Sequence, residues 1–570
     1  MPLSKIPRPS VSTLALATAA LVLAGCASQQ PPQAPAPTGP VAVKVLAIND
    51  FHGNLKPAAG GIRLKGEDPK DPNKLVTVAA GGAEHLHTAV AELRRANPNH
   101  IFVAAGDLIG GSPLLSALFH DEPTVESLGL MGLDVAAVGN HEFDGGIAEL
   151  LRKQYGGCHP KEGCKGPAPF KGAKFQYLAA STWDLKTGKT VLPPYYIKSF
   201  NGIPMAFIGL TLKGTPEIVT PAGVAGLRFD DEAETVNKLV PELKAKGIEA
   251  IALLIHEGGL PTGGPNECPG ISGPIVDIVK KLDKAVDFVV SGHTHRAYTC
   301  QIDGRLVTSG DKYGTLITEI DLQLDPKTRD VISSRANNVV VRTERYAKDP
   351  AQTALIKAYE DLAAPLANRV IGAIAATVSR EPDAAGATAM GQLVADAQLA
   401  ASSAPDKGGA VIALMNIGGV REALTRRANG QVTYGDVFTV QPFSNNLVTL
   451  SLSGDQIRRL LEQQWRDAEH ARGQMLQVSR GFAYTWDAKA PLGARVVPGS
   501  LSLNGQPLDM AASYRVTVNS FVASGGDGFR VLTEGKNALT GLMDVDALEL
   551  YIAANPNLGP APLDRVKRVN

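Results

Sequence analysis

From residue 41 onward, short apolar runs alternate with segments in which apolar positions recur every three or four residues. Leu86, Val90 and Leu93, for example, have the i, i+4, i+7 spacing of one helix face. The apolar runs are typical of buried strands, and each ends abruptly in polar residues. Five runs have this form: VKVLAIND, HIFVAAGD, VAAVGNHEFD, AIALLIHEGG and DFVVSGHTH. Strands alternating with helices predict an α/β domain, whose ligands collect at the carboxyl ends of the strands.

The pattern changes after residue 345. Residues 346–368, with Pro350 near the start and Pro365 near the end, predict one helix. We interpret this helix as a connection and hinge between a domain at 41–345 and a second domain at 369–570. In the second domain, SGDQIRRLLEQQW predicts a further helix. A chain of 570 residues is too long for one hydrophobic core, which also favours two domains.

The N-terminus has the pattern of an export signal, assigned to residues 1–26. A short basic segment precedes an apolar stretch that is too short to span a membrane and ends in Leu-Ala-Gly-Cys. This ending resembles a bacterial lipobox and predicts a lipid on Cys26. The proline-rich residues 27–40 predict an extended tether. We expect a protein exported to the bacterial periplasm or outer membrane and anchored to a membrane by lipid; a plain secretory signal is the alternative.

Charge and cysteine content limit the partners and the compartment. The chain has 56 basic residues (Lys and Arg) and 56 acidic residues (Asp and Glu), so its net charge is zero. A net charge of zero gives no electrostatic indication that the chain binds a nucleic-acid polymer. We expect a monomer that binds no such polymer. Cys158 and Cys164 share one short segment, which favours a disulfide between them and leaves Cys268 with Cys300. A thiolate zinc site is the alternative, weakened by the absence of CxxC spacing.

The candidate chemistry lies where the strand-like runs end. Asp50 and His52 are two residues apart and therefore on one side of an extended chain, and His293 and His295 repeat this spacing. The other strand ends carry Asp107, Asn140, His141 and His256. A lone aspartate there is usually a cap or turn residue, and a lone histidine is more often structural than a ligand. The set as a whole, without thiolates, suits Zn, Mn or Fe.

The ordered series D-x-H, GD, GNHE, H and GHTH resembles the signature of calcineurin-like metallophosphoesterases. GNHEFD and the later PF and GGDGF motifs narrow the resemblance to the 5′-nucleotidase family, which includes bacterial UDP-sugar hydrolases. The resemblance covers about 41–550. It implies an α/β (α+β) fold: a four-layer β-sandwich flanked by helices, the connecting helix, and a smaller mixed α/β substrate domain.

The resemblance also implies two divalent metal ions, of zinc, manganese or cobalt. One would take Asp50, His52 and His295, the other would take Asn140, His256 and His293, and Asp107 would bridge both. Two cations roughly 3.5–4 Å apart can hold a hydroxide and polarise a phosphoryl oxygen. His141 would face the phosphate as a catalytic residue, oriented by Asp144. The alternatives are a structural role for His141 and a turn or cap role for Asp144.

A nucleoside site in the C-terminal domain follows from the same resemblance. NIGGVR, QPFSNN and FVASGGDGF supply its residues: Asn416, Arg421, Phe443, Asn445, Phe521 and Asp527. Phe443 and Phe521 would sandwich the base, because every base has a π-face. Arg421 would bind phosphate or ribose oxygens, and Asp527 would accept hydrogen bonds from the ribose hydroxyls. The alternatives are core phenylalanines and a simple glycine-rich turn.

These features lead to the hypothesis of an exported 5′-nucleotidase that releases phosphate and nucleoside from nucleoside monophosphates. The enzymatic alternatives are a 2′,3′-cyclic-nucleotide 2′-phosphodiesterase with 3′-nucleotidase activity, a UDP-sugar hydrolase, and a thiosulfohydrolase. The pair Phe443 and Phe521 argues against the thiosulfohydrolase, because an inorganic sulfur group needs no aromatic sandwich. A catalytically inactive nucleotide-binding lipoprotein is the alternative of another class. Gln392 and Arg480 depart from relatives near the expected pocket and leave the preferred nucleotide open. The resemblance also implies that only a rotation of the domains brings Phe443 to the metals.

Overall fold

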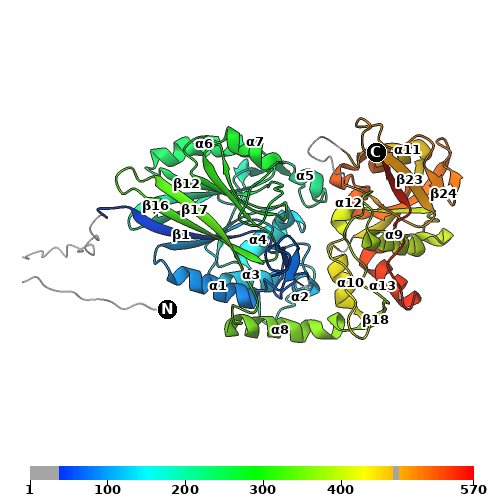
Figure 1. Cartoon of the computed structure of the whole chain (residues 1–570), viewed down its shortest axis with the longest axis horizontal. Coiled ribbons are helices and arrows are strands. Elements are labelled where there is room, and N and C mark those ends of the chain that lie inside the picture. Colours follow the sequence, from blue (N-terminus) through cyan, green and yellow to red (C-terminus); the bar gives the residue numbers. More distant parts are fainter. Residues whose placement is uncertain (1–36, 59, 444, 466–473) are drawn as a thin grey trace, which may run out of the picture.

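The computed structural model describes residues 37–570, except 59, 444 and 466–473. The expected signal at 1–26, the lipidation site Cys26 and most of the expected tether lie outside the described residues. Figure 1 shows two domains joined along one edge by α8 (Pro350–Ala367). Among the described helices, none combines the length and apolar character needed to cross a membrane.

The first domain contains two six-stranded sheets. In one, the strand order is β17–β16–β1–β4–β5–β6. These strands are β17 (Val331–Val340), β16 (Leu316–Leu324), β1 (Val41–Ile48), β4 (His100–Ala105), β5 (Val135–Ala137) and β6 (Gln176–Leu178). β1, β4, β5 and β6 run parallel, whereas β16 and β17 run antiparallel. The carboxyl ends of the parallel strands therefore meet at one edge.

The second sheet has the order β14–β15–β13–β12–β10–β9. Its strands are β14 (Ala297–Ile302), β15 (Arg305–Gly310), β13 (Phe288–Ser291), β12 (Ala250–His256), β10 (Ile203–Thr211) and β9 (Tyr195–Phe200). The four central strands are parallel. The five apolar runs of the sequence are therefore confirmed as strands, namely β1, β4, β5, β12 and β13.

The two sheets pack face to face around one apolar interior, which includes Val45, Val103, Phe207 and Phe288. Helices cover both outer faces: α1 (Ala83–Arg95), α3 (Glu122–Leu130) and α4 (Ile147–Tyr155) on the first sheet, and α6 (Glu232–Ala245) and α7 (Pro274–Lys281) on the second. Figure 1 shows α6 and α7 above the sheets and α1 below them. This helix–sheet–sheet–helix order confirms the four-layer fold.

The C-terminal domain is smaller and mixed, as expected. Its main sheet has the order β22–β19–β26–β21–β27: β22 (Gln477–Val478), β19 (Ile412–Met415), β26 (Ser513–Asn519), β21 (Asn446–Ser453) and β27 (Lys536–Met543). The larger helices are α9 (Ala389–Ser402), α10 (Tyr434–Val440), α11 (Gly454–Glu462) and α13 (Asp544–Ala554). The predicted helix near SGDQIRRLLEQQW is confirmed as α11, which begins with a capping box at Ser453 and Gln456.

The predicted connecting helix is confirmed as α8. Asp349 caps it by accepting a hydrogen bond from the backbone N of Gln352, and Pro350 occupies the first turn, where no backbone donor is needed. Both expected disulfides are also present. One closes the short segment Cys158–Cys164, and the other joins Cys268 to Cys300, in the second sheet.

Candidate active site

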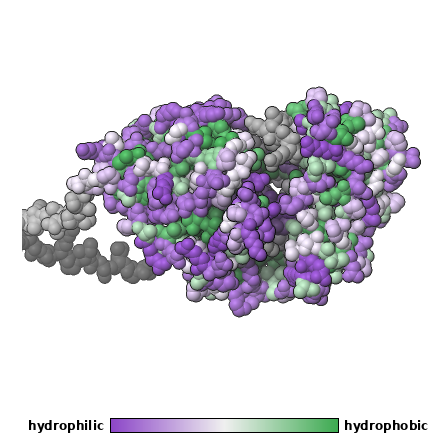
Figure 2. Space-filling model, in the orientation of Figure 1, coloured by the Kyte–Doolittle hydropathy of each residue, from purple (hydrophilic) through white to green (hydrophobic). Residues whose placement is uncertain are grey.

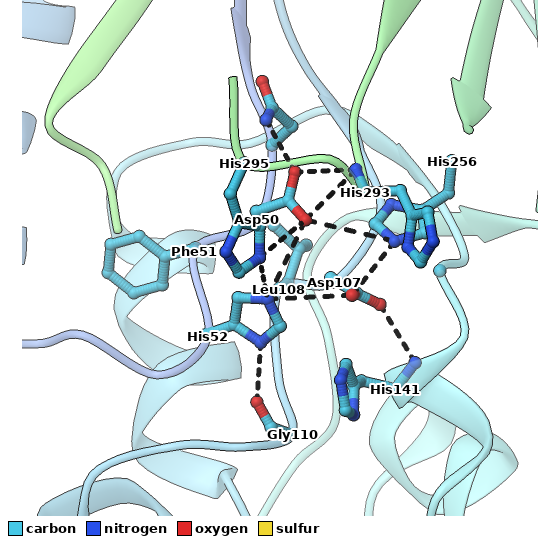
Figure 3. Close-up of polar contacts among 12 residues, drawn as sticks. Asp50, Phe51, His52, Asp107, Leu108, Gly110, His141, His256, His293 and His295 are labelled. Atoms are coloured by element: carbon cyan, nitrogen blue, oxygen red, sulfur yellow. Dashed lines mark hydrogen bonds and ion pairs between the residues drawn. The ribbon is translucent and has the colours of Figure 1, made fainter. Parts of the chain in front are cut away.

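The parallel strands of both sheets deliver the predicted ligands to one place (Figure 3). The segment after β1 carries Asp50 and His52, the segment after β4 carries Asp107, and the segment after β13 carries His293 and His295. His256 is the last residue of β12. Asn140 follows β5 and lines the same cavity as His293. The structure thus brings together all seven residues that the sequence singled out as ligands.

Two nitrogens in this cluster face each other. Nε2 of His52 lies 3.1 Å from Nε2 of His295, and Oδ1 of Asp50 lies 3.4 Å from the His295 nitrogen. Nδ1 of His52 is 2.7 Å from the Gly110 carbonyl oxygen, so this nitrogen donates and Nε2 presents a lone pair. Ligands at about 2.0–2.1 Å from one cation lie about 3 Å apart. The three side chains therefore fit a single divalent cation.

The other half of the cluster contains buried atoms that the protein does not satisfy. Nε2 of His256 and Oδ1 of Asn140 are buried and have no hydrogen-bond partner among the described residues. Nδ1 of His256 donates to the Ala105 carbonyl at 2.7 Å, which turns Nε2 towards Oδ2 of Asp107, 3.0 Å away. A ring nitrogen this close to a carboxylate requires positive charge between them, which a proton or a bound cation supplies. These atoms fit a second cation.

The position of Asp107 is that of a bridge. Its Oδ2 lies 3.0 Å from Nε2 of His256 and 3.7 Å from Nε2 of His52, so one oxygen reaches both halves. Burial lowers the pKa of His256. The negative charges of Asp107 and Asp50 have the larger effect, so the pKa of His256 is raised to about 10. Burial and the charge of His256 lower the pKa of His293 to about 4. The cluster is therefore strongly polarised by its carboxylates.

Five of the seven residues have a backbone conformation that L-amino acids rarely adopt. Their φ values are positive: Asp50 50°, His52 45°, Asp107 49°, His293 70° and His295 51°. A non-glycine residue held there costs on the order of 1–3 kcal/mol, and such residues concentrate at functional sites. The fold therefore accepts strain to turn these side chains inward.

Glu142 was missed by the sequence analysis. Its buried carboxylate accepts hydrogen bonds from the backbone N of Asp107 at 3.0 Å and of Leu108 at 2.9 Å, which hold the bridging segment in place. Burial and the charge of Asp107 raise the pKa of Glu142 to about 7. Asn49, also missed, donates to Oδ2 of Asp50 at 2.6 Å. The available signal was their position inside the ligand motifs.

His141 lies at the edge of the cluster (Figure 3), with its ligand atom within 4.8 Å of those of His52 and Asp107. Its Nδ1 lies 2.6 Å from Oδ2 of Asp144, as expected for an oriented imidazole. Burial lowers the pKa of His141, but the charges of Asp144 and Asp107 raise it more, so the pKa is raised overall. Gly110 packs beneath the pair, where a Cβ would meet the Cβ of His141 at 2.6 Å. Only glycine fits there.

A cavity of about 460 Å³ lies between the two domains, and Figure 2 shows the surface hollowed where they meet. The first domain contributes Asn140, His141, Asp144 and His293 to its lining. The C-terminal domain contributes all six predicted substrate residues: Asn416, Arg421, Phe443, Asn445, Phe521 and Asp527. One cavity thus joins the ligand cluster to the predicted nucleoside site.

Residues of the two domains already touch inside this cavity. The Phe443 ring stacks on the His141 ring at 5.6 Å and 12°, and Nη2 of Arg421 lies 3.5 Å from Nε2 of His52. A Cβ on Gly111 would meet the Phe443 ring at 3.2 Å, so glycine permits the approach. The domains are therefore closed on each other in this structure, and the rotation expected to bring Phe443 to the ligand cluster stays a prediction.

Gln392 and Arg480 were expected near the pocket, and neither of them lines the cavity. Gln392 is fully buried in α9. Arg480 donates to the hydroxyl of Tyr551 at 3.0 Å, away from the cavity, and its backbone N donates to Asp396. Gln392 is thus turned into the packing of its own domain, whereas Arg480 is exposed on the surface, which a linear sequence does not reveal.

Comparison with known proteins agrees with this architecture. Residues 43–297 match the calcineurin-like phosphoesterase family, and residues 370–534 match the 5′-nucleotidase C-terminal domain. Endonuclease YhcR of Bacillus subtilis (strain 168) is 34% identical over 519 residues, which are 91% of this chain but 40% of that protein. This chain therefore spans less than half the length of that relative.

Two further proteins match along nearly their whole length. A 5′-nucleotidase of Vibrio vulnificus (strain CMCP6) is 26% identical over 591 residues, covering 96% of both proteins. The crystal structure of a 5′-nucleotidase precursor from Thermus thermophilus has a TM-score of 0.75 and 26% identity, covering 93% of this chain and 99% of that one. The chain belongs to the 5′-nucleotidase family of calcineurin-like metallophosphoesterases.

Proposed function

We propose that this chain is a 5′-nucleotidase that uses two divalent cations to release phosphate and nucleoside from nucleoside monophosphates. One observation carries the proposal: a single cavity is lined by Asn140 and His293 of the ligand cluster and, from the C-terminal domain, by two phenylalanines with polar partners. A phosphate at the cluster would have its nucleoside beside Phe443 and Phe521. An aromatic pair suits a base, and it has no use in a site for an inorganic sulfur group.

One cation would be held by Asp50, His52 and His295. The other cation would be held by Asn140, His256 and His293, and Asp107 would bridge the two. The orphaned Nε2 of His256 and Oδ1 of Asn140 support this assignment. Bound divalent cations would lower the pKa of the attacking water and polarise a phosphoryl oxygen. Nitrogen and oxygen ligands without thiolates suit zinc, manganese or cobalt.

The protein's own side chains would position the substrate and move the proton. His141, held by Asp144 at 2.6 Å, would donate a proton from its free ring nitrogen to the leaving ribose oxygen. Arg421 would present its planar fork to the phosphate. Asn416 donates to Oδ2 of Asp527 at 2.7 Å, and this pair would bind the ribose hydroxyls.

Export to an oxidising compartment is part of the proposal. Two disulfides are typical of exported proteins, and the Thermus thermophilus relative is described as a precursor. We place a signal at residues 1–26, with lipid on Cys26, and a tether up to residue 40. The connecting helix at 346–368 would then separate a catalytic domain, 41–345, from a substrate domain, 369–570.

The test is a phosphate-release panel on the metal-loaded protein. It covers nucleoside monophosphates, 2′,3′-cyclic nucleotides, UDP-glucose, NAD, and single- and double-stranded DNA, with the metal varied. We expect the fastest release from a 5′-monophosphate, its loss with EDTA, and its recovery with Mn²⁺, Co²⁺ or Zn²⁺. DNA is included because one relative is named an endonuclease, although zero net charge argues against a polymer. Faster cleavage of any other substrate overturns the proposal.

A further inference from the structure

A second group of potential metal ligands lies at the rim of the cavity, apart from the catalytic cluster. His120, His159 and Glu162 each offer a ligand atom, and these atoms lie within 4.8 Å of one another. None of the three belongs to the cluster of Asp50, Asp107 and their partners. His120 nevertheless lines the same cavity. The group therefore calls for an explanation of its own.

The three side chains come from two separate segments. His120 lies between α2 (Leu114–Ala117) and α3, with a positive φ of 53° that fixes its direction. His159 and Glu162 lie within the loop closed by the disulfide Cys158–Cys164. The disulfide and the hydrogen bond from the backbone N of Glu162 to Nδ1 of His159, at 3.2 Å, shape this loop. A covalently closed loop thus presents a histidine and a carboxylate to a third residue.

The protein satisfies this group only in part, since the Glu162 carboxylate forms an ion pair with Lys165 but Nε2 of His120 has no hydrogen-bond partner among the described residues. Nε2 of His120 is buried and makes no hydrogen bond within the described residues, although Oε2 of Glu162 is 3.2 Å away. The His120 and His159 rings stack at 4.0 Å and 13°. A cation shared by the three side chains would give the buried Nε2 of His120 a partner.

We propose that His120, His159 and Glu162 form a third divalent-cation site, selective for zinc. Two imidazoles and one carboxylate are a ligand set that zinc takes, with a fourth position left to water. The stacked rings do not yet aim at one point, so the His159 side chain must turn when the ion binds. Its loop is exposed at Lys161 and Glu162, which leaves room for that turn.

The site is connected to the catalytic cluster through one short segment. Asp121, next to His120, accepts a hydrogen bond from the backbone N of Gly110 at 3.2 Å. The Gly110 carbonyl in turn accepts from Nδ1 of His52 at 2.7 Å. An ion at His120 would therefore fix the segment that orients one of the predicted catalytic ligands.

The test measures zinc stoichiometry, so it does not depend on nucleotidase activity. Tag-free, full-chain protein is stripped with EDTA, equilibrated with Zn²⁺ alone, and analysed for bound metal. We expect one more equivalent in the unchanged chain than in His159→Ala. The same difference of one equivalent is expected in an Asp107→Ala background, where the catalytic sites are impaired.

Two further variants of the same loop sharpen the test. Glu162→Gln keeps the size of the side chain but removes its charge. This variant should bind the third equivalent of zinc with an affinity at least about tenfold lower. Lys161→Ala is the matched control, because Lys161 shares the loop and its exposure but offers no predicted ligand. Equal zinc content in the unchanged chain and in His159→Ala overturns the proposal. Should Asp107→Ala fail to fold, the comparison in the unchanged background decides.

Discussion

Asp107 and His141 lie close together but reach different partners. The side chain of Asp107 points between His52 and His256, whereas the ring of His141 is held by Asp144. The backbone N of His141 donates a hydrogen bond to Oδ1 of Asp107 at 2.9 Å, and its ring meets the His52 ring edge-on with centroids 5.2 Å apart. The two residues should therefore fail in different ways when their side chains are removed.

Asp107→Ala should lose bound metal at both catalytic positions together with activity, because the shared oxygen is gone. His141→Ala should keep the metal content of the unchanged chain while kcat falls roughly 10²-fold or more. Metal analysis and phosphate-release kinetics on the same preparations check both expectations. An equal loss of metal in both variants contradicts the role assigned to His141.

Asp544 makes the stability of the C-terminal domain depend on pH. Burial raises the pKa of its carboxyl from 3.8 to about 7. Between these values the folded state binds more protons than the unfolded state, so this contribution to stability is present at low pH and is lost as pH rises through 7. Asp544→Asn removes the titration and keeps an acceptor for the backbone N of Val545.

The Tm of Asp544→Asn relative to the unchanged chain should therefore rise between pH 5 and pH 8. Thermal unfolding at intermediate pH values measures this trend. Asp406→Asn is the control, because Asp406 is exposed, and its Tm difference should stay flat. A constant difference for Asp544→Asn would show that this carboxyl does not titrate with folding.

At the scale of elements, the two disulfides close loops of different length. Cys268–Cys300 spans 32 residues and ties the segment after β12 to β14, whereas Cys158–Cys164 spans 6. Loop-closure entropy then predicts stabilisation by about 3.7 and about 2.2 kcal/mol respectively. The longer disulfide should therefore matter more, although both are local to the first domain.

Replacing Cys268 and Cys300 by serine should cost about 1.5 kcal/mol more than replacing Cys158 and Cys164. Urea unfolding of the two double variants, followed by a probe in the first domain, gives the comparison. The double variant at Cys158 and Cys164 serves as the matched control. The reverse order would mean that contacts in the closed loops, rather than chain entropy, dominate.

At the scale of the whole molecule, the proposed function predicts that the domains, closed in this structure, open for nucleoside to leave. Besides the contacts in the cavity, the domains are joined by exposed ion pairs such as Arg63 with Glu381, 3.6 Å apart. These two residues lie outside the catalytic and substrate sites. They allow the domains to be locked without altering the site itself.

Arg63→Cys/Glu381→Cys, joined by a short bismaleimide, should lower kcat at least about tenfold, because product release requires opening. Phosphate release before and after crosslinking measures the effect. Each single variant treated with the same reagent is the control. An unchanged rate in the crosslinked protein would show that substrate and product pass without domain motion.

The positions of the candidate ligands were predictable because strand ends in parallel sheets converge. This prediction needed only the hydrophobic pattern and the rule that ligands bind at the carboxyl ends of parallel strands. The apolar runs in question end in Asp50, Asp107, His256 and His293. Glu142 was not predictable in this way. Its role depends on backbone N–H groups of Asp107 and Leu108, some 34 residues earlier in the chain, which only the folded structure places beside it.

The sequence by itself determined the two domains, the connecting helix, the disulfide pairs and the identity of the candidate ligands. These depend on local periodicity and on residue type, which the chain carries directly. Only the tertiary structure decided that the domains are closed, that Gln392 and Arg480 face away from the cavity, and that His120 meets His159 and Glu162. Such contacts join distant segments through packing, and packing has no linear signature.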